Sequence, residues 1–341
     1  MSRKRGWIKI GWLLFCWGVV LAGKEAWSAQ SPEEFYQGKT LVLISSDPGG
    51  PTDVIARTMA PYLEKEIGAR VKIENKKTDE VMNYLYKQGP RGSLMVAIKA
   101  SDGIIGNEIL KAPGVQYETD KFNFLADVYP AVKVFQLSPK LPYKTLSALR
   151  EARGLKAGGT SAKGALAMSS AVMLEVLGLE GKVISGYKGK KELTLAMARG
   201  EIDFVVTSDN AAMRDEKDGY VVNLMVLSDK RSAVIPHVPA LAELGVTVPK
   251  DKGPVYRFIN SGGMAVATSP GVPQERVEYL RAAFQRLSKN QDLRKAVEKL
   301  TGTSKDFVSG KEVQEEMGEI KSDKEMAAKL DALFKKHTAL R

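Results

Sequence analysis

A glycine-rich turn between an apolar run and a helical segment is the first place where this chain could hold a ligand. The turn is Ser45-Ser46-Asp47-Pro48-Gly49-Gly50-Pro51-Thr52-Asp53, and it follows the apolar run 40–44. Glycines let a backbone approach a ligand closely. Thr52 or Asp53 could cap the next helix, whose free N–H groups and positive dipole end favour an anion. Many α/β proteins have such a turn without a ligand, so the turn alone leaves both interpretations open.

A second turn of the same kind lies near the middle of the chain, at Ala157-Gly158-Gly159-Thr160-Ser161-Ala162-Lys163-Gly164. The Lys163 ammonium could contact a ligand carboxylate at the start of the following helix, or it could be a solvated loop lysine. Asp47 in the first turn could bind a ligand amine, oppose Lys163 or cap its own backbone. Ser161 and Lys163 have the residue types of a Ser-Lys dyad, but their spacing shows neither a positioned base nor an oxyanion site.

Cysteine and histidine are nearly absent, which excludes several kinds of chemistry. Cys16 is the single cysteine and lies in the leader segment described next, and His237 and His337 are the two histidines. A disulfide framework, a cysteine nucleophile and a thiolate metal site are therefore excluded from the mature chain. Two histidines 100 positions apart offer too few ligands for a histidine zinc site and little basis for a Ser-His-Asp relay. Neither turn has the spacing of a dinucleotide fingerprint or a phosphate loop. We expect no metal, no cofactor and no enzymatic activity.

The first residues have the pattern of an export signal. Arg3, Lys4 and Arg5 form a basic start, and the apolar stretch 10–23 follows. That stretch is shorter than the roughly 20 residues of an ordinary membrane span. Small residues at Ala26 and Ser28 predict a signal peptide over 1–28 and a periplasmic mature protein. The alternative is a retained membrane anchor.

The charge of the chain favours small anionic ligands over nucleic acid. The net charge is +11, and it falls to +7 without residues 1–28. A nucleic-acid surface would concentrate these charges beside aromatic side chains. Lysine and arginine instead alternate with acidic residues, notably over 275–336, as on solvated helix faces. We expect no nucleic-acid binding.

The order of apolar runs predicts an α/β protein with two lobes and a cleft between them. Strands at 40–44, 71–73 and 94–98 alternate with helical segments and predict a parallel sheet. A second α/β block with its own glycine-rich turn covers 132–207. Two such blocks predict a cleft. We place the first lobe at 31–127 and 228–341 and the second at 128–227.

Read from end to end, residues 35–334 resemble the extracytoplasmic solute-binding receptors of tripartite tricarboxylate transporters, the Bug family. The family's opening pattern, Pro-Phe-Pro-Pro-Gly-Gly-Gly-Thr-Asp, lies over the first turn. The other matching motifs keep the family's order and spacing; they are Glu74-Asn75, Gly92-Ser93-Leu94, Leu141-Pro142-Tyr143-Lys144-Thr145-Leu146, Gly186-Tyr187-Lys188-Gly189, Arg199-Gly200-Glu201-Ile202-Asp203, Ser228-Asp229-Lys230-Arg231-Ser232, Pro236-His237-Val238-Pro239, Glu243-Leu244-Gly245 and Ala267-Thr268-Ser269-Pro270-Gly271-Val272-Pro273.

This resemblance implies a type II periplasmic-binding fold that closes on a ligand, usually a carboxylate, and presents it to membrane permease subunits. It implies a monomer without a cofactor. The ligand would lie between the two turns, supported by the loop after residue 98 and by 207–209. The ligand-binding residues expected from these positions are Ser46, Asp47, Gly49, Gly50, Thr52, Asp53, Ser101, Thr160, Ser161, Lys163, Gly164, Tyr187, Thr207 and Asp209.

The chain departs from the family's pattern at the expected site. Ser46 and Asp47 replace a phenylalanine and a proline, and Lys163-Gly164-Ala165-Leu166-Ala167 replaces Gly-Ser-Xaa-Ser-His. We therefore carry over the fold and the receptor class but not the usual ligand. Two alternatives stay open: a sensor subunit that binds the same ligand class for a signalling partner, and a hydrolase on the same scaffold, because a fold does not settle function.

Overall fold

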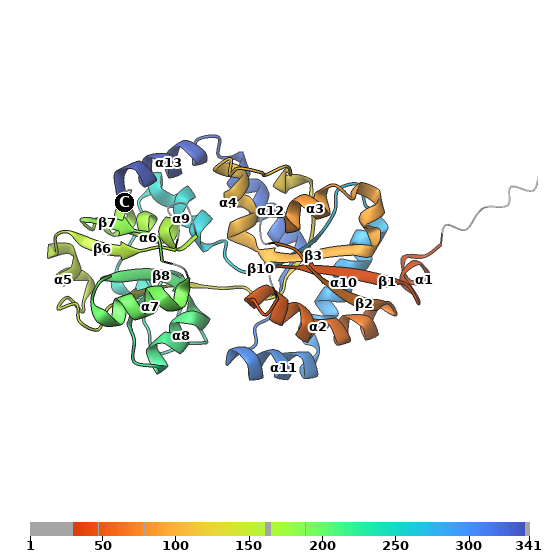
Figure 1. Ribbon diagram of the computed structural model, residues 1–341, viewed down its shortest axis with the longest axis horizontal. Coiled ribbons are helices and arrows are strands. Elements are labelled where there is room, and N and C mark those ends of the chain that lie inside the picture. The colour runs from red at the N-terminus through yellow and green to blue at the C-terminus, as the bar shows by residue number, and fades with distance from the viewer. Residues whose placement is uncertain (1–29, 47, 78–79, 161–164, 188, 338–341) are drawn as a thin grey trace, which may run out of the picture. The chain divides into compact units, whose positions relative to one another are not determined.

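The computed structural model describes residues 30–46, 48–77, 80–160, 165–187 and 189–337. Residues from Pro32 onward form one compact unit that contains two β-sheets, each with helices packed against it (Figure 1). The predicted signal peptide lies outside the described residues. Within the described part of the chain, no helix is long and apolar enough to cross a membrane.

The first sheet has the strand order β11-β4-β10-β3-β1-β2. Strands β2 and β3 flank β1 and run parallel to it, as the βαβαβ order predicts. Strand β10 returns from late in the chain and pairs antiparallel with both β3 and β4, so the complete sheet is mixed and not purely parallel. Its strands are β1 (Thr40–Ser45), β2 (Arg70–Asn75), β3 (Met95–Ala100), β4 (Asn123–Asp127), β10 (Met264–Thr268) and β11 (Val308–Ser309).

Helices cover both faces of this sheet. On α2 the predicted stripe of Ile55, Met59, Leu63 and Ile67 is buried, and the helix ends at Gly68, whose φ of 66° suits glycine. Helices α2, α10 and α11 share one hydrophobic core, whereas α3, α4 and α12 pack into another. The helices of this lobe are α1 (Pro32–Tyr36), α2 (Pro51–Ile67), α3 (Val81–Tyr86), α4 (Ser101–Ile109), α10 (Gln274–Lys289), α11 (Gln291–Thr301) and α12 (Gly310–Ser322), with short 3-10 turns η1 (Gly89–Leu94) and η2 (Thr119–Lys121).

The second sheet has the order β7-β6-β8-β5-β9. Strand β6 runs parallel to β7 and β8, and β5 runs antiparallel to β8 and β9. Helix α6 is apolar on nearly all sides and is largely buried, as expected for a helix enclosed by other elements. The elements are β5 (Lys133–Leu137), α5 (Leu146–Glu151), β6 (Leu155–Gly158), α6 (Ala165–Leu177), β7 (Gly181–Ile184), α7 (Lys190–Arg199), β8 (Phe204–Ser208), α8 (Asp209–Lys217) and β9 (Val222–Val226).

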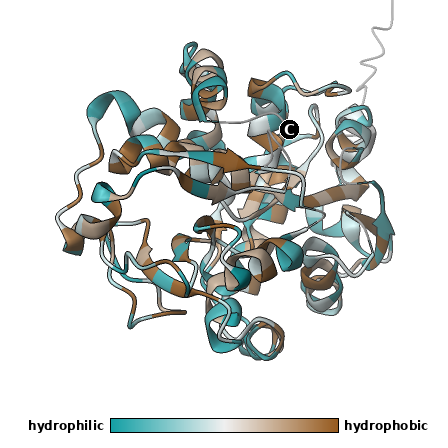
Figure 2. Ribbon diagram, turned by 60° about the vertical axis from the view of Figure 1, so that its left-hand side comes forward, coloured by the Kyte–Doolittle hydropathy of each residue, from teal (hydrophilic) through white to brown (hydrophobic). Residues whose placement is uncertain are grey.

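Three segments, at 128–132, 261–263 and 323–325, connect the elements of the first sheet with those around the second. Helix α9 contacts α6 and also α4 and α12, so it joins the two halves of the core. Figure 2 shows apolar residues along the strands and on stretches of the helices between more polar outer segments. The remaining elements are η3 (Ala242–Leu244), η4 (Lys250–Lys252), α9 (Gly253–Asn260) and α13 (Met326–His337).

The lobe boundaries given above stay a prediction, and two sets of contacts favour a different assignment of the late segments. Ile235 and Val238 pack with Val134 and Val226 of the second sheet. Helix α13 contacts α6, α9 and β7. We would therefore extend the second lobe from residue 227 to the end of α9 and add α13 to it.

Candidate functional site

The expected ligand segments follow the carboxyl ends of parallel strands. Because β1 and β3 are parallel neighbours, the turn after β1 and the start of α4 lie at the same edge of the first sheet. The same relationship between β6 and β8 brings Gly159-Thr160 and the start of α8 to one edge of the second sheet. Carboxyl edges of parallel strands are where α/β proteins usually bind ligands.

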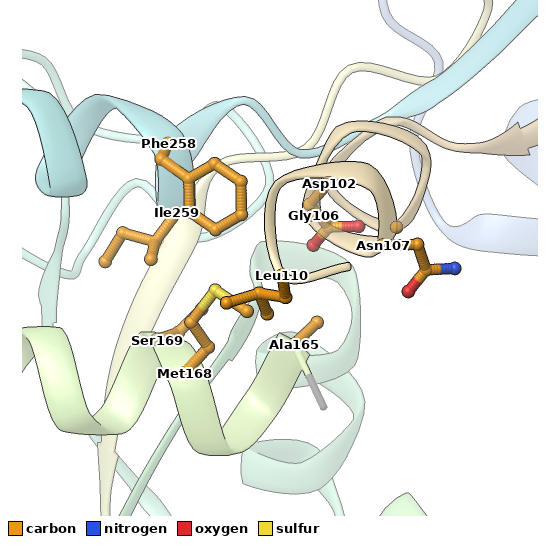
Figure 3. A pocket seen from close by; sticks show the side chains of 10 residues that line it. Asp102, Gly106, Asn107, Leu110, Ala165, Met168, Ser169, Phe258 and Ile259 are labelled. Atoms are coloured by element: carbon orange, nitrogen blue, oxygen red, sulfur yellow. The ribbon is translucent and has the colours of Figure 1, made fainter. Parts of the chain in front are cut away.

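A narrow cavity lies between helices from these two edges (Figure 3). Helix α4, which follows β3, forms one wall, the first turns of α6 form the opposite wall, and α9 closes the third side. The cavity has a volume of about 80 Å³. Its lining residues are Asp102, Gly103, Gly106, Asn107, Leu110, Ala165, Met168, Ser169, Phe258 and Ile259.

Glycine at position 106 lets two walls of the cavity approach each other. A Cβ at Gly106 would lie 3.1 Å from Cζ of Phe258, closer than an ordinary van der Waals contact. At Gly103, one turn earlier, a Cβ would have only the Cε of Lys99 within reach, at 4.0 Å. The packing of α4 is therefore tight at Gly106, against α9, and open at Gly103.

In the first turn, Asp53 braces the backbone and does not cap the helix. Its carboxylate accepts hydrogen bonds from the Gly49 N–H at 2.9 Å, from Arg57 Nε at 2.8 Å and from Asn75 Nδ2 at 2.7 Å. Ser45 Oγ donates a fourth, at 3.0 Å. Burial alone would raise the pKa of Asp53, but these hydrogen bonds outweigh it and hold that pKa well below its ordinary value.

The predicted capping role of Thr52 and Asp53 is therefore wrong. Gly50 occupies the N-cap position of α2 without a side-chain cap, and Pro51 begins the helix, where its missing N–H costs nothing. Thr52 instead shares a hydrogen bond with Ser46 across the turn. Gly49 has a φ of 75°, which glycine adopts without strain. The first turn is thus a braced loop in front of an uncapped helix N-terminus.

Ser101 lies at the start of α4 and supports the segments that link the sheets. Its N–H donates to the Gly263 carbonyl at 3.2 Å, and its Oγ lies 3.5 Å from Oδ2 of Asp127. Asp127 Oδ1 accepts from the N–H groups of Tyr129 at 3.0 Å and Met264 at 2.8 Å. Burial raises the pKa of Asp127 to about 6, although these hydrogen bonds oppose the shift.

The ion pair between Asp102 and Lys133 is a feature that sequence reasoning missed. Lys133 Nζ lies 3.0 Å from Asp102 Oδ2, and the two side chains are only 9% and 14% exposed. The pair joins α4 to β5, across the two sheets, and Asp102 lines the cavity. A lysine at the start of a strongly apolar strand was the available signal, because a buried lysine is nearly always paired.

Thr207 and Asp209 are buried within the protein, where a ligand between the lobes would not reach them directly. Thr207 lies within β8 and pairs with Val134. Asp209 is fully buried, and its Oδ2 accepts from Ser232 Oγ at 2.7 Å and from Lys305 Nζ at 2.8 Å. The Asn210 N–H donates to the other oxygen at 3.0 Å. The carboxylate of Asp209 is thus occupied by protein groups.

The second turn can be described only in part. Thr160 is partly exposed at the end of β6, and Tyr187 packs against the small core around Leu193. The predicted site residues Asp47, Ser161, Lys163 and Gly164 lie outside the described residues. Within the ranges that the structure describes, no group of three or more histidine, cysteine, aspartate or glutamate side chains could hold a metal ion.

The two-lobed α/β fold, with a cavity between helices that follow strands of both sheets, is the fold of periplasmic binding proteins. Solved structures show the same fold. A solute-binding protein from Polaromonas, without ligand, matches with a TM-score of 0.69 and 20% identity over 88% of this chain and 99% of that one. MatC from Rhodopseudomonas palustris, with bound malate, matches with a TM-score of 0.62 and 20% identity over 83% and 98%. The predicted fold class is confirmed.

A sequence model described as the tripartite tricarboxylate transporter family receptor matches residues 55–316. The chain therefore belongs to this family of periplasmic, non-enzymatic solute receptors, as the motifs predicted. The Bordetella pertussis protein BugT is 25% identical to it over 251 residues, which are 68% of this chain and 74% of BugT.

Proposed function

We propose that this receptor captures a small organic anion, a carboxylate, between its two sheets and delivers it to the membrane permease of a tripartite tricarboxylate transport system. Family membership supports the transport role. The relative MatC, whose structure contains malate, supports the ligand class. We further propose that the mature receptor lies in the periplasm after removal of residues 1–28.

One observation carries the proposal: helices from the carboxyl edges of both sheets line the same cavity. Helix α4 follows β3 of the first sheet, and α6 follows β6 of the second. A ligand there would contact both lobes. It would shift the equilibrium toward a closed form by the difference between its affinities for the two forms.

We assign the carboxylate end of the ligand to the backbone of the first turn. The N-terminus of α2 has free N–H groups and no side-chain cap, and glycine at positions 49 and 50 leaves the backbone accessible. The residues that we retain as candidate contacts are Ser46, Gly49, Gly50, Thr52 and Thr160. We assign Asp53, Ser101, Thr207 and Asp209 to the support of the site, because they are buried and Asp53, Ser101 and Asp209 are already hydrogen-bonded.

A thermal-shift screen of the mature protein against mono-, di- and tricarboxylates tests the proposal. A ligand at a hundredfold excess over its Kd should stabilise the protein by about 2.7 kcal/mol and should remain chemically unchanged. Loss of uptake of that ligand in a strain without this gene would support delivery to a permease. No stabilisation by any carboxylate would refute the ligand class, and unchanged uptake would favour a sensing role.

A further inference from the structure

The cavity between α4, α6 and α9 has an apolar interior. Met168 on α6 and Phe258 and Ile259 on α9 are all at least nine-tenths buried, and Leu110 on the α4 side adds a fourth apolar side chain (Figure 3). The polar side chains of the lining are Asp102 and Asn107, which are partly buried on α4, and Ser169, which is 2% exposed on α6. A ligand segment that enters the cavity would therefore meet mostly hydrocarbon, with Ser169 as the one fully buried polar residue among the described lining residues.

The charge of the lining disfavours a second carboxylate at this end of a ligand. Among the described residues that line the cavity, Asp102 is the one ionisable group, and its carboxylate is already paired with Lys133. In this described part of the lining, a ligand carboxylate would find no unpaired cation, so it would lose hydration there without forming an ion pair in return. Burying an unpaired carboxylate costs several kcal/mol, whereas burying a methylene group gains about 0.8 kcal/mol.

The size of the cavity indicates that it holds only part of a ligand. Its volume of about 80 Å³ is far below the roughly 300–1,000 Å³ of pockets that enclose a whole drug-sized molecule. The carboxylate that we assign to the first turn would lie outside it. The cavity is then suited to the opposite end of the same molecule.

We propose that the ligand is a monocarboxylate with an apolar end, aliphatic or aromatic, and that this end occupies the cavity between α4, α6 and α9. This inference rests on the proposed function, because it assumes that a carboxylate binds between the lobes. It separates this receptor from one that holds a carboxylate at both ends of its ligand.

Matched pairs of acids test the ligand class. Hexanoate and adipate have the same number of carbon atoms and differ by one terminal carboxylate, and benzoate and terephthalate form an aromatic pair. Calorimetry on the mature protein should find that the monocarboxylate of at least one pair binds about tenfold or more tightly than its dicarboxylate, because one carboxylate is not desolvated. Equal or tighter binding of the dicarboxylate in both pairs would overturn the inference and leave the proposed function standing.

Filling the cavity tests its location. Gly103→Leu would place a side chain in the cavity without backbone strain, since a Cβ at this helical position meets only the end of Lys99. Gly318→Leu is the matched control, because a Cβ on that glycine of α12 meets nothing within 4 Å and does not face the cavity. Gly103→Leu should weaken monocarboxylate binding about tenfold or more, and Gly318→Leu should not.

A polar variant at the rim gives a second measurement. Leu110→Asn changes a partly buried side chain at the end of α4, so the preference for the monocarboxylate should shrink, and the melting temperature shows whether the variant remains folded. If both Gly103→Leu and Leu110→Asn bind the acids as the wild type does, the cavity is not where the apolar end lies. If no carboxylate of any kind binds the wild type, the proposed function itself fails, which is a different result from a preference for dicarboxylates.

Discussion

Lys305 and Asp209 form a buried ion pair that connects the first lobe to the second. Lys305 Nζ lies 2.8 Å from Asp209 Oδ2 and 2.8 Å from the carbonyl oxygen of Pro130, in a segment that links the two sheets. Asp209 is fully buried, and the Lys305 side chain is 16% exposed. Lys305 comes from the chain between α11 and β11, whereas Asp209 begins α8. Both residues also hold the linking segment, since the Asp209 N–H donates to the carbonyl oxygen of Val132 at 2.8 Å.

Replacing this lysine should destabilise the protein strongly. Lys305→Met leaves the Asp209 carboxylate buried without a cation, so the free energy of unfolding should fall by about 3–5 kcal/mol. Urea denaturation measures this change. Lys289→Met is the control, because Lys289 pairs with Asp306 at the surface, where both side chains are more than half exposed, and a surface pair contributes at most about 1 kcal/mol. Equal effects of the two substitutions would contradict the interpretation.

The pH dependence of stability should contain a contribution from Asp127. Burial raises the pKa of this carboxyl from 3.8 to about 6. The folded protein therefore holds the proton more tightly than the unfolded chain. The resulting stabilisation is fully present below about pH 4 and is lost as the pH rises through 6.

Asp127→Asn should remove that contribution, since an amide has no proton to lose in this range. Its oxygen can accept from the N–H groups of Tyr129 and Met264 as the carboxylate does. The free energy of unfolding of the variant minus that of the wild type should be about 2 kcal/mol larger at pH 7 than at pH 4. Chemical denaturation at both pH values gives this difference. If the difference in the free energy of unfolding between the two proteins is the same at both pH values, Asp127 has an ordinary pKa.

Asp53 should control both the stability of the first turn and ligand affinity. Asp53→Ala removes the acceptor of the Gly49 N–H and of Asn75, so we expect a loss of about 1–3 kcal/mol in the free energy of unfolding. Ligand binding should weaken as well, because the turn loses its brace. Arg57→Met is the control, since it removes only a half-exposed partner and should cost less than about 1 kcal/mol. Unaltered ligand affinity in Asp53→Ala would separate this turn from the site.

Gly263 should not tolerate even a methyl group. A Cβ at this position would lie 1.7 Å from Oδ2 of Asp127, so Gly263→Ala must displace the carboxylate that holds the linking segments together. We expect a destabilisation of about 1–3 kcal/mol, typical of overpacking. Gly318→Ala, in open space on α12, should instead stabilise the protein by up to about 1 kcal/mol. Thermal unfolding of both variants distinguishes steric conflict from a general effect of removing glycine.

The basic, apolar and small segments of residues 1–29 predict removal of the leader on export. Mass spectrometry of the native protein should place its N-terminus between residues 29 and 31. Recovery of chains that begin with Met1 in the membrane fraction would support an anchor instead.

The sequence by itself determined the family and the fold class, and it determined several helices and strands because these depend on short-range patterns. Apolar residues at every fourth position predicted α2, and glycine at 68 and 200 predicted where α2 and α7 end. The glycine-rich turns and the motifs that follow them predicted a two-lobed receptor. Such signals lie within a few residues of the structure that they specify.

Only the tertiary structure decided what the polar residues do. Asp209 and Lys305 are 96 positions apart, and nothing local indicates that they meet. Asp102 and Lys133 are brought together by β3 and β5, which belong to different sheets. Asp53 has the residue type and position of a helix cap, yet neighbours from the adjacent strand and its own turn engage its carboxylate. A buried charge is stabilised by whichever partners the packing brings within hydrogen-bonding distance, and that choice depends on the whole fold.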